Sequence, residues 1–289
     1  MITLTNEILQ VTIATKGAEL QSIYNKQTGL EYMWNADPNF WAKQSPVLFP
    51  IVGGLKNGSY KFAGKTYQLS RHGFAREMVF EIETQTATSV TFFIQSSAET
   101  LAVYPFEFKF SLVYTIQKNQ LTVTYIVENK GEEKLYFSVG AHPAFKVPLV
   151  TGDVYEDYYL AFNKTETTGI YPLSTEGLIE LATAPILNNT NQLMLTKALF
   201  YKDALVFKEL RSTAISILNR NNKNGLTVTY DGFPYMGIWA AKNANFVCIE
   251  PWCGLADSVN TTGKLEDKEG INSINNTDIF KKSWLVEMF

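Results

Sequence analysis

Residues 108–129 read FKFSLVYTIQKNQLTVTYIVEN, two runs of alternating apolar and polar side chains on either side of Lys118-Asn119. Alternation with a period of two places successive side chains on opposite faces of an extended chain, and β-branched and aromatic residues favour strands. Two such runs with a short polar turn between them are typical of an antiparallel hairpin. The sequence therefore predicts an antiparallel pair of strands over 108–116 and 120–129.

The same alternation recurs along most of the chain. Residues 79–84 and 89–94 predict a second hairpin, and residues 204–207, 214–218 and 226–230 predict further single strands. Turn residues such as Asn57-Gly58, Lys130-Gly131 and Asn224-Gly225 recur at short intervals between them. Short strands at this spacing are typical of a sandwich or a barrel.

Evidence for helices is weak. Residues 37–42, 99–103 and 193–199 each predict a turn or two of helix, and no alternation of strands with helices appears. No repeat of fixed period and no low-complexity linker divides the chain. The fold class is therefore predicted to be all-β, a large antiparallel β-sandwich with few short helices, in one domain over residues 1–289.

Composition and charge exclude several classes of function. Apolar residues make up 46% of the chain and its net charge is -3, with no block of lysines and arginines, so neither nucleic acid nor a polybasic membrane surface is expected. No run of about 18 apolar residues predicts a membrane-spanning helix, and residues 1–7 do not resemble a secretory signal. Cys248 and Cys253 are five apart, so alternation places them on opposite faces of a strand. We expect free thiols in a reducing cytoplasm.

Both histidines of the chain occur where the strand pattern breaks. His72 lies in RHGFAR, residues 71–76, and His142 lies in GAHPAF, residues 140–145. Histidine is the side chain whose ordinary pKa lies nearest neutrality, so it is the usual proton donor and acceptor. The alternatives are a His72 that only caps a turn between two arginines, and a His142 that is half-buried and bonded to the backbone.

Two carboxylates accompany these histidines as candidates. Glu250 follows the apolar run FVCI and precedes Pro251-Trp252, so burial at the end of a strand would raise its pKa toward that of a general base. The alternative is a glutamate that ends a strand in solvent. Asp231 stands before Gly232, where an aspartate of a tight turn is the alternative to a ligand-binding role.

Four segments together resemble the aldose 1-epimerase (galactose mutarotase) family, and in particular its bacterial branch often encoded beside lactose-utilisation genes. They are FPIVG (49–53), HGFAR (72–76), AHPAF (141–145) and CIEPW (248–252), in the family's order along the chain. The resemblance covers nearly the whole sequence. It implies a galactose mutarotase-like supersandwich and an isomerase that works without cofactor or metal on a monosaccharide.

The resemblance also implies roles for single residues. His142 would act as the general acid on the ring oxygen of the sugar, and Glu250 as the base that takes the proton from the anomeric hydroxyl. His72 and, by a looser match, Asp231 would bind the sugar. Many family members carry an arginine where this chain has Gly54, so Arg71 or Arg76 is expected to supply the missing donor. Aromatic candidates for an apolar sugar platform, with core packing as the alternative, are Phe74, Trp239 and Trp252.

This chemistry leads to the hypothesis that burial raises the pKa of Glu250 while the neighbouring carboxylate keeps His142 protonated. One alternative is a sugar-binding or regulatory module without turnover, which the glycine at position 54 favours. Another is a hexose-phosphate mutarotase, with the phosphate held by Lys43, Lys56, Arg71 and Arg76. A glycoside hydrolase would leave both histidines without a role. The sequence leaves the sugar unidentified and leaves both a monomer and a homodimer open.

Overall fold

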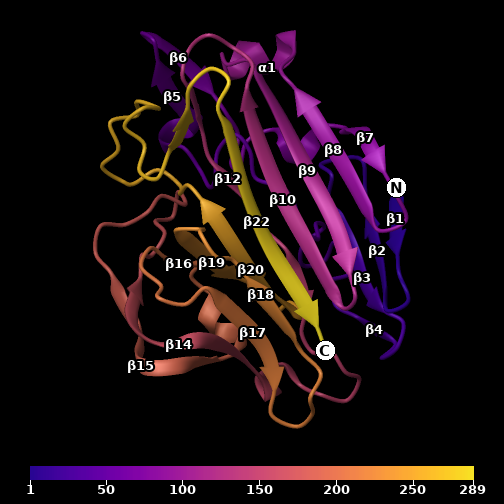
Figure 1. The fold of residues 1–289 in the computed structure, drawn as a ribbon. Coiled ribbons are helices and arrows are strands. Elements are labelled where there is room, and N and C mark those ends of the chain that lie inside the picture. Colours follow the sequence, from indigo (N-terminus) through magenta and orange to yellow (C-terminus); the bar gives the residue numbers. More distant parts are fainter.

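The computed structural model describes residues 1–289 as an arrangement of mostly antiparallel strands (Figure 1). The largest sheet has nine strands in the order β15-β14-β17-β18-β22-β10-β9-β8-β7. In chain order its strands are β7 (Glu81–Gln85), β8 (Ser89–Gln95), β9 (Phe108–Gln117), β10 (Gln120–Asn129), β14 (Tyr158–Ile170), β15 (Ala184–Met194), β17 (Ala214–Asn219), β18 (Leu226–Thr229) and β22 (Ile279–Met288). The all-β fold class predicted from the sequence is confirmed.

The hairpin predicted over 108–129 forms the middle of this sheet. Gln117 pairs with Gln120, so Lys118 and Asn119 make a two-residue turn, and Lys118 adopts a φ of +52°. Every second side chain of β10 is buried, from Leu121 to Val127, while the side chains between them are only partly buried. The β7–β8 hairpin is also confirmed, with its first strand beginning at Glu81, two residues later than predicted.

A second sheet carries the residues around the predicted site. It has the order β12-β20-β19-β16, with β13 pairing on β20 beyond this path. Its strands are β12 (Val139–Gly140), β13 (Ala144–Lys146), β16 (Leu205–Phe207), β19 (Tyr235–Trp239) and β20 (Phe246–Cys253). All eight residues of β20 are buried, which makes it the innermost strand of this sheet.

The remaining strands form smaller sheets. Near the N-terminus they are β1 (Ile2–Thr5), β2 (Leu9–Ile13), β3 (Leu20–Asn25) and β4 (Leu30–Glu31); the others pair as β5 (Ser59–Phe62) with β6 (Lys65–Gln68) and β11 (Leu135–Phe137) with β21 (Asn272–Ile274). The four N-terminal strands lie behind β8 and β9 in Figure 1, and the hydroxyl of Tyr114 on β9 donates to the carbonyl of Ala18 at 2.6 Å. One hydrophobic cluster of 69 buried residues includes Val11, Val123 and Ile249, so the three larger sheets share a core.

Helices are few and short. The prediction over 99–103 is confirmed by α1 (Ala98–Val103), whose first turn is capped by the hydroxyl of Ser97. The prediction over 193–199 is partly wrong, because β15 continues to Met194 and only a 3-10 turn, η4 (Lys197–Phe200), follows. Residues 37–42 form turns and no helix. The other 3-10 turns are η1 (Lys56–Gly58), η2 (Ala75–Glu77) and η3 (Tyr155–Asp157). None of these helices has the length and apolar character needed to cross a membrane.

Candidate active site

A cavity of about 530 Å³ lies against the second sheet, at the segments where the strand alternation breaks. The residues of the sequence-predicted site that line it are Arg71, His72, Arg76, His142, Trp239, Glu250 and Trp252. These residues come from positions up to 181 apart along the chain, and the fold brings them to one place.

Two of the predicted site residues lie elsewhere. Asp231 is exposed in the turn between β18 and β19 and is not part of the cavity lining. Phe74 is also outside the lining and packs edge-on against Phe49 and Tyr104, with ring centroids 6.2 and 6.1 Å apart. The alternatives considered from the sequence, a turn aspartate and a core aromatic, therefore describe these two positions better.

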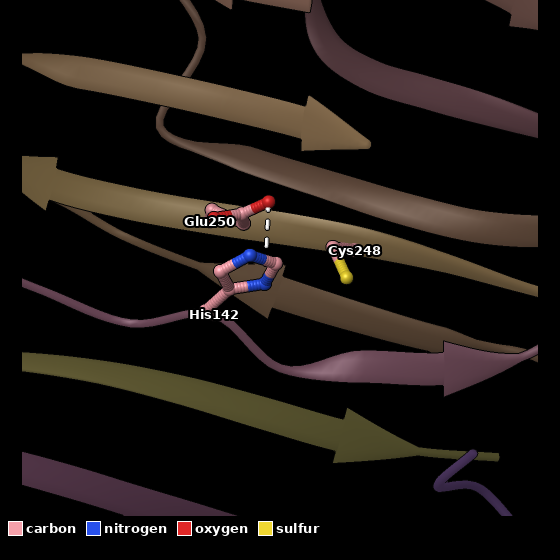
Figure 2. A group of neighbouring side chains, drawn as sticks. All are labelled: His142, Cys248 and Glu250. Carbon is pink, nitrogen blue, oxygen red and sulfur yellow. Dashed lines mark ion pairs between the residues drawn. The ribbon is translucent and has the colours of Figure 1, made fainter. Parts of the chain in front are cut away.

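Glu250 and His142 face each other in the lining of the cavity. Glu250 lies in the middle of β20 opposite Gly237 of β19, and His142 lies on the link between β12 and β13, both of which pair with β20. Nδ1 of His142 is 3.4 Å from Oε1 of Glu250 (Figure 2), with side-chain exposures of 11% and 2%. Nδ1 of His142 and Oε2 of Glu250 are buried without a hydrogen-bond partner. The two side chains are therefore close together, and Nδ1 of His142 and Oε2 of Glu250 remain available for hydrogen bonds or proton transfer.

Burial controls the proton on this pair. Desolvation raises the pKa of Glu250 well above its ordinary value, and Asp203 adds to the increase. Desolvation lowers the pKa of His142 to about 3, and the charge of Arg76 contributes. The expectation that the carboxylate keeps His142 protonated is therefore not met in the free protein, because loss of hydration outweighs the attraction between the two groups. Burial therefore favours the neutral forms of both groups, with the shared proton on the carboxyl of Glu250 rather than on the ring of His142.

His72 is fixed by a pair of backbone contacts. Its backbone N–H donates to the carbonyl of Gly53 at 2.8 Å, and the N–H of Gly53 donates to its Nδ1 at 3.1 Å. Because Nδ1 accepts a hydrogen bond, Nε2 carries the proton of the neutral ring and is left to donate. Burial lowers the pKa of His72, and His142, Arg76 and Arg71 lower it further. His72 is thus a neutral hydrogen-bond donor whose ring centroid lies 5.7 Å from that of His142.

Arg71 lies beside the position where the expected arginine is replaced by glycine. Its Nε is 4.0 Å from the place of a Cβ on Gly54, and its Nη2 donates to the carbonyl of Glu176 at 3.4 Å. A Cβ on Gly177 would overlap Nη2 of Arg71 and would lie 2.7 Å from its Cζ. Gly177, with a φ of +75°, is therefore required for the present position of the guanidinium.

Arg76 is the second cation near the histidines. Its Nε is buried without a hydrogen-bond partner, and its nearest ion-pair contact is with Oε1 of Glu77 at 4.0 Å. The guanidinium therefore keeps donor capacity toward the cavity.

Tryptophans enclose the Glu250–His142 pair. The ring of Trp41 stacks on His142 with a centroid separation of 4.9 Å, and Trp239 contacts His142 edge-on at 5.5 Å. Trp252 donates from Nε1 to the carbonyl of Ala141 at 3.2 Å, which ties β20 to the segment that carries His142. These rings exclude water from the pair and give the cavity an apolar wall.

Comparisons with known proteins identify the family of this chain. The family profile described as aldose 1-epimerase matches residues 1–264. The chain belongs to the aldose 1-epimerase family. Protein LacX, chromosomal, of Lactococcus lactis subsp. lactis is 38% identical over 292 residues, which cover 98% of this chain and 97% of LacX.

Solved structures of other aldose 1-epimerase relatives have the same fold. A galactose mutarotase related enzyme from Lactobacillus acidophilus has a TM-score of 0.95 at 37% identity and covers 100% of this chain and 97% of its own. A galactose mutarotase-like protein from Lactobacillus casei has a TM-score of 0.94 at 29% identity, with 100% of both chains covered. The expected galactose mutarotase-like sandwich is thereby confirmed.

Sequence reasoning missed several residues that line the cavity of this aldose 1-epimerase family member. They include Trp41, Tyr201, Lys202 and Asp203. Trp41 lies in a segment read as a weak helix, and Asp203 follows η4 with a φ of +125°, in a turn that no motif marks. None of these four residues stands in a motif that points to a ligand, and Trp41 follows directly on another aromatic residue, Phe40.

Proposed function

We propose that the protein is a mutarotase that interconverts the α and β anomers of a hexose by opening and closing the sugar ring. Family membership supports an isomerase of this type, and the adjacency of Glu250 and His142 supports the mechanism. The hydroxyl that loses a proton and the ring oxygen that gains one are both bonded to the anomeric carbon. The base and the acid must therefore be neighbours, and 3.4 Å between Nδ1 and Oε1 meets this requirement.

Ring opening moves one proton in each direction. Glu250 as carboxylate takes the proton of the anomeric hydroxyl, while His142 as imidazolium protonates the ring oxygen and the bond from that oxygen to the anomeric carbon breaks. The open aldehyde then rotates about its bond to the next carbon. Closure on the other face returns both protons, so neither metal nor covalent intermediate is needed. The pair alternates between one ionised and one neutral form with the same total charge.

Burial favours the neutral form of the pair in the free protein, so the bound sugar must stabilise the ionised form. Hydroxyl groups of the sugar supply hydrogen bonds to the unpartnered Oε2 of Glu250, and Nε2–H of His72 and the guanidinium of Arg71 orient the ring. Trp41 and Trp252 give its C–H face an apolar surface. Asp203 replaces Asp231 as the acidic group available to bind a hydroxyl.

Mutarotation by two single variants tests the proposal. Glu250→Gln and His142→Asn each remove one proton-transfer group and are expected to slow the enzymatic polarimetric relaxation of fresh α-D-glucose and α-D-galactose by about 10²–10⁴-fold. Asp231→Asn, outside the cavity, serves as the matched control and is expected to keep the wild-type rate. Wild-type rates in both Glu250→Gln and His142→Asn would refute the assignment. Tight sugar binding without any acceleration by the wild type would support a binding module instead.

A phosphorylated hexose is a second candidate substrate, favoured by the cations in the cavity lining. Arg71, Arg76 and Lys202 contribute side chains there. Lys43, in contrast, pairs with Glu77 at 3.1 Å, and Lys56 donates to the carbonyl of Val259 at 2.7 Å, so neither contributes. Stronger competition by hexose 6-phosphates than by the free sugars, lost in Lys202→Ala, is the result expected of this alternative.

A further inference from the structure

Cys248 is a buried thiol beside the Glu250–His142 pair that the mutarotase mechanism does not use. It lies two residues before Glu250 on β20, so both side chains point to the same face of the strand. Its thiol is free and its residue is 0% exposed. Figure 2 shows Cys248 and Glu250 on the same strand, with the ring of His142 against both. One ligand atom each of His142, Cys248 and Glu250 lies within 4.8 Å of the other two.

The atoms that converge there have unmet bonding capacity. Nδ1 of His142 and Oε2 of Glu250 are buried and have no hydrogen-bond partner in the protein. Their residues are only 8% and 1% exposed, so solvent does not supply the missing partners. Buried polar atoms in folded proteins are nearly always bonded, so unpartnered ones at a single point indicate a ligand. A sugar hydroxyl accounts for the carboxylate, but it does not account for a thiol next to both groups.

We propose that His142, Cys248 and Glu250 form a binding site for Zn²⁺, and that the bound ion blocks the active site. A nitrogen, a sulfur and a carboxylate oxygen are the ligand types that Zn²⁺ prefers, and the thiolate excludes Mg²⁺ and Ca²⁺. The blocking effect rests on the proposed function, because the metal takes the proton acceptor Glu250 and the lone pair of His142. The cavity leaves room for a water molecule or a sugar hydroxyl as the fourth ligand.

Small side-chain movements suffice to form the site. Bond lengths of about 2.3 Å to sulfur and about 2.0 Å to nitrogen or oxygen place ligand atoms of a tetrahedral zinc ion about 3.5 Å apart. The present separations of at most 4.8 Å therefore need to shrink by about 1 Å. Rotation of Cys248 about its Cα–Cβ bond moves the sulfur with no change in the strand.

Charge and proton balance also suit a dication. Burial raises the pKa of the Cys248 thiol and of the Glu250 carboxyl, which favours the protonated form of each group. Binding of Zn²⁺ replaces these two protons, which leave to solvent, and the site of thiolate, carboxylate, neutral imidazole and dication has no net charge. Affinity for the metal is therefore expected to rise with pH.

Two titrations test the site: cobalt binding is followed by absorption, independently of catalysis, and zinc binding is followed by its effect on mutarotation. Wild-type protein titrated with Co²⁺ is expected to show the near-ultraviolet thiolate-to-cobalt absorption band. Cys248→Ala is expected to lack this band. Cys253→Ala, which removes the buried thiol on the opposite face, is the matched control and is expected to retain it. Zn²⁺ is expected to inhibit wild-type mutarotation, a chelator to restore it, and Mg²⁺ or Ca²⁺ to have no effect.

In Cys248→Ala the inhibitory Zn²⁺ concentration is expected to rise more than about tenfold, since even loss of groups that only support a ligand costs about 10–100-fold in metal affinity. Cys248→Ser, whose hydroxyl is a poor zinc ligand, is expected to give the same result. It replaces Cys248→Ala in the test if alanine at this position lowers the melting temperature too far. A cobalt band without mutarotase activity would keep the site and reject the proposed function. Absence of the band in wild type, zinc sensitivity as high as that of wild type in both Cys248 variants, or faster mutarotation with zinc would overturn the proposal.

Discussion

Replacing Gly177 by alanine tests whether Arg71 takes over the role of the arginine that is absent at position 54. The new methyl group would occupy the place of the Arg71 guanidinium, which is the far end of a flexible and exposed side chain. The arginine is therefore expected to swing away while the backbone stays in place. Alanine at a φ of +75° costs about 1–2 kcal/mol of stability by itself.

The expected functional effect follows from the hydrogen bond that Arg71 supplies. A hydrogen bond to a charged group contributes about 1.5–3 kcal/mol, and the lower value applies to an exposed arginine. KM for the hexose is therefore expected to rise about tenfold in Gly177→Ala and in Arg71→Ala, with kcat nearly unchanged. The double variant is expected to show no further increase, because the two changes remove the same contact.

Gly64→Ala provides the matched control. Gly64 has a φ of +77°, and nothing lies within 4 Å of a Cβ built there. It should lose similar stability by denaturant unfolding but keep the wild-type KM in the polarimetric assay. A Gly177→Ala enzyme with wild-type KM beside an Arg71→Ala enzyme with raised KM would refute the dependence of Arg71 on Gly177. Wild-type KM in both would show that Arg71 does not bind the sugar.

Two further predictions concern stability. His142 has a pKa lowered to about 3 in the folded chain and one near 6.5 when unfolded, so only the unfolded chain gains this proton as pH falls below about 6.5. Between pH 7 and pH 5 the wild type should therefore lose about 2 kcal/mol more of its unfolding free energy than His142→Asn does, as measured by urea titration. Equal losses in the two proteins would contradict the lowered pKa. Lys268 and Asp257 form an ion pair of 2.6 Å with side-chain exposures of 2% and 3%, so Lys268→Met should cost about 3–5 kcal/mol because the carboxylate stays buried. Lys208→Met, which removes a partly exposed pair, should cost about 1 kcal/mol or less, and a similar loss in both variants would count against this reasoning.

The strands were predictable because their side chains alternate. Residues 108–129 carry enough β-branched and aromatic side chains to fix both the hairpin and its faces, and β10 shows the expected burial. The helix over 193–199 was mispredicted because pairing with β14 keeps residues up to Met194 in a strand. Local sequence does not encode which strand an edge segment will meet, so such boundaries depend on the tertiary fold.

The site was predictable where a motif breaks the strand pattern. His72 and His142 stand in such breaks, and both line the cavity together with Glu250. Glu250 lies in the middle of β20, and not at the strand end that the sequence predicted. Asp231 was chosen by a loose match to the family, although the aspartate that lines the cavity is Asp203, placed there by the turn after η4. Trp41 reaches His142 only because residues 37–42 fold over the second sheet, a long-range contact that no spacing in the sequence reveals.

The protonation state of His142 also could not be predicted from the sequence. Proximity to a carboxylate suggested a raised pKa, but the cost of burying a charged imidazole under Trp41 and Trp239 reverses the shift. The sign of a pKa shift depends on how much water reaches the group, and this exposure is a property of the fold.

The central claim, that Glu250 and His142 act as one proton-exchange unit, is tested most directly by comparing kcat/KM for mutarotation in Glu250→Gln, His142→Asn and the double variant. Groups that act as a unit lose nearly all of their effect when either one is removed. The double variant is therefore expected to be no slower than the slower single variant. Losses that multiply in the double variant would contradict the account, because they would show two groups that act independently.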